Sequence, residues 1–197
     1  MFGKENDYKL RYIYHTNRHN NAYLIELNLD KYQDLFNSWD GAALDRKELD
    51  PELHNFLERA SYELPINENL ELSFYLPENK KDKKMEADSR ATIKNNFRMN
   101  LFFIDQNLKN MRKKILYYVL LGTGFLLSTY LFPETQNYSI LFSLILEGLF
   151  IGGWVFLWEA ASLFFFKSNE LRSKKKRYLR YLDSDIIFNY RKENEKE

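Results

Sequence analysis

Cysteine is absent from this 197-residue chain, and histidine occurs only three times. The absence of cysteine excludes disulfides, iron–sulfur clusters, cysteine zinc sites and thiol nucleophiles. A net charge of +1 gives no electrostatic reason to expect nucleic acid as a partner. The sequence has no phosphate-binding loop, dinucleotide-binding glycine motif or nucleophile elbow, so it identifies no catalytic residue and no cofactor.

Lysine and arginine are also missing from residues 115–166, which carry three acidic residues. The flanking segments are basic: residues 79–114 have 11 basic and 4 acidic side chains, and residues 167–197 have 10 and 6. Residues 1–78 are acidic, with 8 basic and 15 acidic side chains. A stretch without basic residues between two basic blocks is typical of a membrane protein.

This stretch holds two apolar runs. Residues 115–132 carry no charge and would span about 27 Å as a helix, close to the hydrocarbon thickness of a bilayer. Residues 138–166 exceed one perpendicular span and include Glu147 and Glu159. We predict transmembrane helices at 115–132 and 139–166, joined by an outer loop at 133–138. The second helix should extend into the cytoplasm beyond about Trp158, which places Glu159 at the boundary.

The basic flanks predict the orientation. Lys113 and Lys114 precede the first span and Lys167 follows the second, whereas the outer loop has no lysine or arginine. Both termini should therefore be cytoplasmic, with Trp154 and Trp158 toward the interface. The same basic residues are candidates for contact with anionic lipid headgroups. A buried helical hairpin in a soluble protein is the alternative.

Residues 1–84 predict an α+β cytoplasmic domain, with a three- or four-stranded sheet and helices. Alternating apolar residues predict strands at 8–14, 22–29 and 69–76, the first two joined through the loop 15–21. A short helix should follow Asp30, and Asp50–Pro51 should start a longer helix that Pro65 stops. Residues 185–190 are a candidate fourth strand, through which the basic C-terminal segment 167–197 would dock on this domain.

Residues 85–114 predict an amphipathic helix that continues into the first span. Its apolar residues are spaced alternately by four and three, at Phe97, Leu101, Ile104, Leu108, Met111 and Ile115. This seam could cover the domain's own sheet or pair with the helix after Trp158. A parallel stalk between subunits is the alternative, and under three heptads do not decide between them.

Glu147 is the main candidate site, because a lone carboxylate near the middle of a bilayer costs about 3 kcal/mol unless it is neutralised or paired. Ser139 and Ser143 precede it at four-residue spacing and give a polar stripe. Gly148 and Gly152 form a small-xxx-small pair that permits close helix approach. The stripe predicts a protein–protein face within the membrane. Glu147 would either lock helices together or line an ion or proton pathway in an oligomer.

The remaining polar groups give weaker signals. His15 and His19 lie four apart, with His54 elsewhere, but no metal-binding motif is present, so no metal site is predicted. The acidic residues Asp40, Asp45, Glu48 and Asp50 lack the spacing of a calcium loop. Lysines at 80–84 are better explained as a solvated loop than as a phosphate site.

Several short motifs occur in order along the chain. They are Phe36–Asn37–Ser38–Trp39–Asp40, Leu49–Asp50–Pro51–Glu52, Glu63–Leu64–Pro65, Leu76–Pro77, Glu147–Gly148, Gly152–Gly153–Trp154 and Arg177–Tyr178. With this set the chain resembles a group of small uncharacterised bacterial two-pass membrane proteins with a cytoplasmic N-terminal domain. The resemblance implies an inner-membrane setting and an accessory role, and it transfers no catalytic residue.

The sequence therefore predicts an oligomeric membrane protein that acts as a sensor, scaffold or effector subunit, with a cytoplasmic protein or small ligand as a further partner. It would contact the lipid bilayer and other copies of itself, and it is not a self-evident enzyme. The alternative is a ligand-gated pore-forming or ion-conducting effector with Glu147 facing the lumen. A membrane-bound enzyme that uses His15, His19 or the acidic loop is a third hypothesis.

Overall fold

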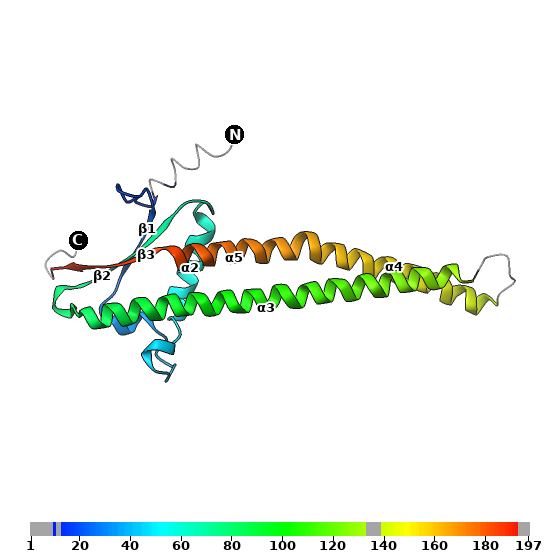
Figure 1. Ribbon diagram of the computed structural model, residues 1–197, viewed down its shortest axis with the longest axis horizontal. Helices are drawn as coiled ribbons and strands as arrows, with labels where there is room; N and C mark the ends of the chain where they lie inside the picture. The colour runs from blue at the N-terminus through cyan, green and yellow to red at the C-terminus, as the bar shows by residue number, and fades with distance from the viewer. Residues whose placement is uncertain (1–9, 11–12, 133–138, 193–197) are drawn as a thin grey trace. The chain divides into compact units, whose positions relative to one another are not determined.

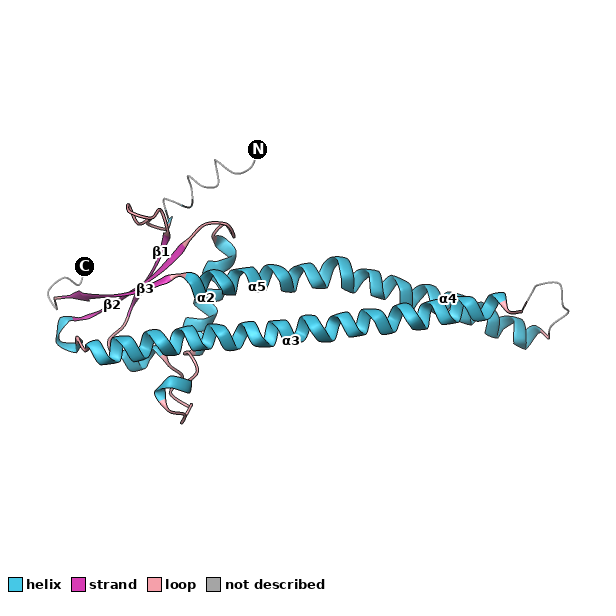
Figure 2. Ribbon diagram, viewed as in Figure 1, coloured by secondary structure: helices cyan, strands magenta, loops and turns pink. Residues whose placement is uncertain are grey.

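A computed structural model describes residue 10, residues 13–132 and residues 139–192, so the predicted outer loop at 133–138 lies outside the described residues. The chain divides into two compact units. The sheet unit holds the residues up to Phe102 and those from Lys176 onward, and the helical unit holds Phe103–Lys175. Figure 1 labels the strands and helices along the chain, and Figure 2 shows that every strand belongs to the sheet unit.

The sheet unit is built on three parallel strands in the order β1-β2-β3: β1 (Tyr23–Asn28), β2 (Leu70–Pro77) and β3 (Asp185–Arg191). The strands predicted at 22–29, 69–76 and 185–190 are thereby confirmed, and so is the α+β class. The C-terminal strand completes the sheet beside β2, as the predicted docking of the last segment requires. All three strands run parallel because helical segments separate them in the chain.

The strand predicted at residues 8–14 is wrong for the residues that the structure describes. Leu10 and Ile13 are helical, and the Tyr14 N–H donates to the Leu10 carbonyl at 2.7 Å, the bond of a helical turn. Leu10 and Tyr14 lie four apart, so this short apolar pattern fits a helical turn as well as a strand. In the described part of this region, an isolated antiparallel bridge joins Thr16, which lies in the predicted loop, to Tyr23.

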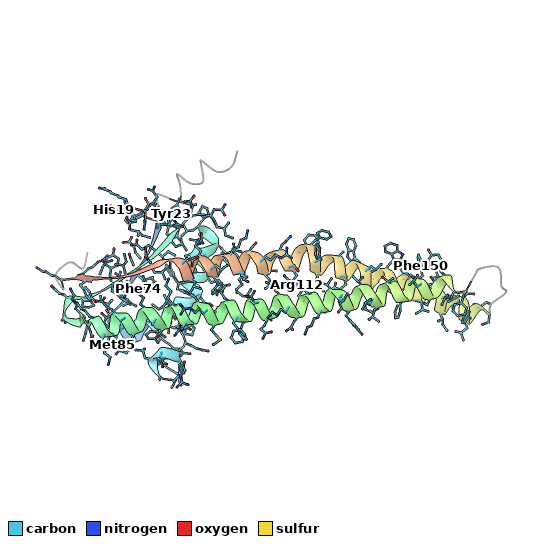
Figure 3. The ribbon with its side chains drawn as sticks, viewed as in Figure 1. His19, Tyr23, Phe74, Met85, Arg112 and Phe150 are labelled. Atoms are coloured by element: carbon cyan, nitrogen blue, oxygen red, sulfur yellow. The ribbon has the colours of Figure 1, made fainter. Side chains whose placement is uncertain are left out.

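One face of the sheet forms the core of this unit. Leu72 and Phe74 of β2 are fully buried there, and the Phe74 ring, labelled in Figure 3, stacks on Phe188 of β3 at 5.4 Å. Phe97 and Tyr181 are also buried, with their rings stacked at 5.2 Å. The core therefore joins side chains far apart in the sequence, which burial of apolar surface stabilises.

Helix α2 (Pro51–Glu63) starts as predicted, because the Asp50 carboxylate accepts hydrogen bonds from Glu52 N at 2.9 Å and Leu53 N at 3.3 Å. Its last turn is held by buried Arg180, whose Nη2 donates to the Ser61 carbonyl at 3.1 Å. Three short 3-10 helices complete the unit: η1 (Tyr32–Leu35), η2 (Leu44–Arg46) and η3 (Glu78–Lys80).

The remaining helices follow one another between β2 and β3 in the chain. They are α3 (Lys83–Tyr130), α4 (Ile140–Ser162), the π-helical turn η4 (Leu163–Lys167) and α5 (Ser168–Asp183). The prediction that residues 85–114 continue unbroken into the first apolar run agrees with the uninterrupted helix α3. The parallel β2–β3 pair thus takes the whole helical unit as its crossover connection.

The apolar seam of α3 is covered within one chain. Phe97, Leu101, Ile104 and Leu108 are all buried. Within the helical unit, the Ser168 hydroxyl of α5 donates to the Met111 sulfur at 3.3 Å. Pairing of the seam with the helix after Trp158 explains this burial, and no intersubunit stalk is needed for it.

Candidate functional site

The apolar helix α4 and the last turns of α3 expose most of their large side chains. Ile140 is 83% exposed, Trp158 is 76% exposed and Leu120 of α3 is 64% exposed. Among the described residues, one helix, Ile140–Asp183, is long and apolar enough to cross a membrane, and 6% of its most apolar stretch is buried. The apolar end of α3, residues 115–130, would span about 24 Å, less than a full perpendicular span.

Within the helical unit, α3 and α4 pack through two glycines. A methyl group on Gly122 would lie 2.8 Å from the Gly153 carbonyl, and one on Gly153 would lie 3.0 Å from the Gly122 carbonyl. Further pairs run in opposite chain order, Tyr118 with Phe156 and Phe132 with Phe142. The two helices are therefore antiparallel, and the close approach depends on the missing side chains.

The predicted polar stripe lies on the exposed side of α4. Ser143 and Glu147 are both exposed, whereas Gly153 is buried, about 120° around the helix from Glu147. Gly148 is exposed, and nothing lies within 4 Å of a Cβ there. The structure thus brings Ser143, Glu147 and Gly148 onto one surface that α3 does not cover.

The other two predicted members of this site have different roles. Ser139 is the N-cap of α4, where its hydroxyl accepts from Phe142 N at 3.4 Å. Gly152 lies against the Phe125 ring, 3.5 Å from a Cβ placed there, so it belongs to the contact between α3 and α4. Sequence spacing alone missed Gly122 and Gly153, although each belongs to a run of small residues that signalled close packing.

The predicted interface residues lie at one end of the apolar helices. Trp154 and Trp158 are exposed on α4, and Lys113 and Lys114 are exposed on α3, with the Lys114 ammonium 5.4 Å from the centre of the Tyr118 ring. Lys167 lies in the π-helical turn and pairs with Glu170 at 2.8 Å. Aromatic and basic side chains of this kind suit a membrane–water boundary.

The second face of the sheet carries a polar cluster that the sequence analysis did not identify. The Tyr75 hydroxyl of β2 donates to Glu26 of β1 at 2.7 Å, and the Arg191 guanidinium of β3 lies 3.8 Å from the centre of the Tyr75 ring. Burial and the hydrogen bond to Glu26 raise the pKa of Tyr75. The sequence signal for this cluster was alternation along the strands, which places Glu26, Tyr75 and Arg191 at positions that face away from the core.

His15, His54 and Asp40 of the acidic loop have hydrogen-bonding partners. His15 lies 3.0 Å from Glu26, and His54 lies 3.2 Å from the Tyr178 hydroxyl. In the described part of the chain, no three histidine or carboxylate side chains gather in a way that could hold a metal ion. Asp40 accepts from the backbone N–H groups of Glu48 and Ala42, which lowers its pKa and holds the loop in shape.

Comparisons of the chain with protein-family models, curated proteins and solved structures found no match.

Proposed function

We propose that this protein crosses a bacterial inner membrane twice, through residues 115–132 and 139–166, and carries the sheet unit in the cytoplasm. This proposal rests mainly on the exposure of large apolar side chains over the whole length of α4. A soluble monomer rarely exposes a contiguous apolar patch above a few hundred Å². A hydrocarbon environment would solvate these side chains, and a continuous helix pairs its backbone N–H and C=O groups internally, as a membrane span requires.

The short apolar end of α3 fits this proposal. Lys113 and Lys114 directly precede it, and long basic side chains bury their stems while their charged ends reach the interface. Leu131 and Phe132, which follow the helix, add apolar length at the other end. A modest shortfall in span length costs fractions of a kcal/mol per Å.

The exposed Glu147 favours assembly into a homo-oligomer. It lies on the side of α4 that is turned away from the contact with α3, so a single chain would present this carboxylate to lipid. Ser143 one turn earlier offers a hydroxyl donor, and Gly148 beside it leaves room for a second helix. A second copy on this face would pair Glu147 and cover the surface.

We assign the sheet unit a sensor, scaffold or effector role rather than a catalytic one. Its polar second face, with Glu26, Tyr75 and Arg191, offers charged and aromatic groups to a cytoplasmic protein or small ligand. Both membrane helices are inserted between the adjacent strands β2 and β3. Binding at the sheet and rearrangement of the helices would therefore be linked through the continuous helix α3 on one side and α5 on the other.

Oligomer size in detergent tests this proposal. Light scattering of the wild-type protein should show a defined oligomer, which Gly148→Leu and Glu147→Leu weaken. The matched control is Gly124→Leu, because Gly124 on α3 also has open space at its Cβ. A wild-type protein that stays monomeric at all concentrations would remove the oligomer proposal. A protein that stays in aqueous solution without detergent would remove the membrane proposal.

Exposure of Glu147 also favours a second candidate function, an ion-conducting effector. Two helices per chain cannot enclose a pore, so several copies would have to place Glu147 toward a shared lumen. Flux of cations from loaded liposomes should then fall in Glu147→Gln while the oligomer persists. Absence of flux from wild-type liposomes under every trigger tried would exclude this function and leave the scaffold role in place.

A further inference from the structure

The end of the helical unit that carries Lys113 and Lys114 combines exposed cations and exposed aromatic rings. On α3 the cations are Arg112, Lys113 and Lys114, all exposed. On the π-helical turn the rings are Phe164, Phe165 and Phe166, each more than half exposed. We name these six residues the basic–aromatic belt.

Contacts within the helical unit place the two halves of the belt at the same level. Met111 lies level with Ser168, because the Ser168 hydroxyl donates to its sulfur at 3.3 Å. Tyr118 lies level with Phe156, whose ring centroid is 5.6 Å away. Since α3 and α4 are antiparallel, residues 112–114 are level with about residues 162–167. Cations and rings therefore form one zone around this end of the unit.

The three cations of the belt have no anionic partner among the described residues. Lys167 and Lys175 have anionic partners, Glu170 at 2.8 Å and Asp105 at 2.7 Å. By contrast, no described side chain forms a hydrogen bond or ion pair with Arg112, Lys113 or Lys114, and no acidic residue lies between Asp105 and Glu134 in the sequence. A cluster of cations without counter-charges attracts an anion to the surface.

The three exposed rings lie on the π-helical turn. Ser168 N–H donates to the carbonyl of Leu163, five residues earlier, so the helix is locally widened. The Asn169 amide donates to the Phe165 carbonyl at 2.7 Å and satisfies the backbone there. The three consecutive rings of this turn are exposed, so in a bilayer they can enter the acyl-chain boundary beneath a headgroup.

We propose that the basic–aromatic belt binds the headgroups of anionic phospholipids in the cytoplasmic leaflet. This inference rests on the proposed membrane function and adds a lipid preference to it. Arg112, Lys113 and Lys114 pair with the phosphate groups, and Phe164–Phe166 contact the adjoining chains. Each cation near an anionic surface strengthens binding about fivefold, so the belt favours an anionic lipid over a zwitterionic one.

The tryptophans of α4 allow a direct test, because Trp154 and Trp158 lie on the exposed side near the belt. The full chain carrying Trp39→Phe, which removes the tryptophan of the sheet unit, is reconstituted in bilayers of mixed lipid. Quenching of fluorescence by brominated phosphatidylglycerol is compared with quenching by brominated phosphatidylcholine. We expect a preference for phosphatidylglycerol of about fivefold or more that falls toward one as salt rises from about 0.05 to 0.5 M.

Three sets of substitutions distinguish an effect of lost charge from an effect of altered folding. Arg112→Gln/Lys113→Gln/Lys114→Gln should lose the preference, and Arg112→Lys/Lys113→Arg/Lys114→Arg should keep it. The control Lys80→Gln/Lys83→Gln/Lys84→Gln removes three exposed charges from the sheet unit and should leave it unchanged. Equal quenching of wild type by both lipids at low salt would overturn the lipid preference while leaving membrane insertion intact. If neither lipid quenched the fluorescence, the result would contradict both the membrane proposal and the lipid preference.

Discussion

The sheet unit buries phenylalanine and arginine side chains of the kind that the helical unit exposes. Phe97, in the first half of α3, is 1% exposed, whereas Phe166 in the helical unit is 74% exposed. Arg180 of the sheet unit is buried and donates to backbone carbonyls, whereas Arg112 is exposed without a described partner. The sheet unit buries its large apolar side chains, as a water-exposed fold does, whereas the helical unit exposes them. This contrast is what the membrane proposal explains.

Removal of large rings should show this difference most strongly. Phe74→Ala empties a fully buried site between strands, and we expect a loss of about 3–5 kcal/mol in stability of the sheet unit. Phe165→Ala removes an exposed ring and should cost less than about 1 kcal/mol. Hydrogen exchange of β2 amides in the detergent-solubilised full chain measures both. Equal effects would contradict the contrast between the units.

Removal of arginine charge should show a smaller contrast. Arg180→Gln leaves the carbonyls of Ser61 and Pro65 without their donor in a buried place, so we expect a loss of about 2–3 kcal/mol. Arg112→Gln should change stability by less than about 0.5 kcal/mol. Exchange of the α2 amides reports the first effect. An Arg180→Gln protein as stable as wild type would show that water replaces these bonds.

The glycines sharpen the comparison inside the helical unit. Gly153→Val places side-chain atoms against the Gly122 carbonyl and the Leu126 side chain, so α3 and α4 must separate. We expect this substitution to lower the stability of the helix pair by about 1–3 kcal/mol. Gly148→Val meets open space in the chain and should leave the helix pair intact. Thermal unfolding in detergent, followed by helical circular dichroism, compares the two. For assembly, the oligomer proposal predicts the opposite result: Gly148→Val should weaken the oligomer more than Gly153→Val does.

Alkaline pH should weaken the sheet unit gradually. Burial, followed by a hydrogen bond to Glu63, raises the pKa of Tyr14 to about 12 from 10.0. The neutral phenol is favoured in the folded state, so its contribution is complete below pH 10 and is lost as pH rises from 10 to about 12. Tyr14→Phe should reduce the slope of stability against pH in this range. Tyr130→Phe, at an exposed position in the helical unit, is the control.

Much of the sheet unit could be predicted from local sequence. Asp50–Pro51 predicted the start of α2, and alternating apolar residues predicted β1 and β2, because burial of one face imposes period two. The segment 185–190 was a candidate strand, and it forms β3. The parallel pairing could not be predicted, since it depends on which distant strands meet. Leu10 and Ile13 are helical but were assigned to a strand, because four-residue and two-residue spacings coexist in so short a segment.

The candidate site was only partly predictable. Helical spacing placed Ser143 and Glu147 on one face, as observed, but it gave no reference for which face α3 would cover. The choice of Gly153 over Gly148 for that contact depends on the register between two helices, which a glycine pattern does not contain. The cluster of Glu26, Tyr75 and Arg191 needed the strand order before its members could be seen together.

Topology in living cells tests the central claim most directly. Because the native chain has no cysteine, single cysteines at Asn20, Thr135 and Lys192 can be labelled in a bacterial host with no background. A maleimide that does not cross the inner membrane should label position 135 in cells with a permeable outer membrane, and positions 20 and 192 only after the inner membrane is opened. Labelling of position 20 or 192 in intact cells, or recovery of the protein in the soluble fraction, would contradict a chain that crosses twice and returns to the cytoplasm.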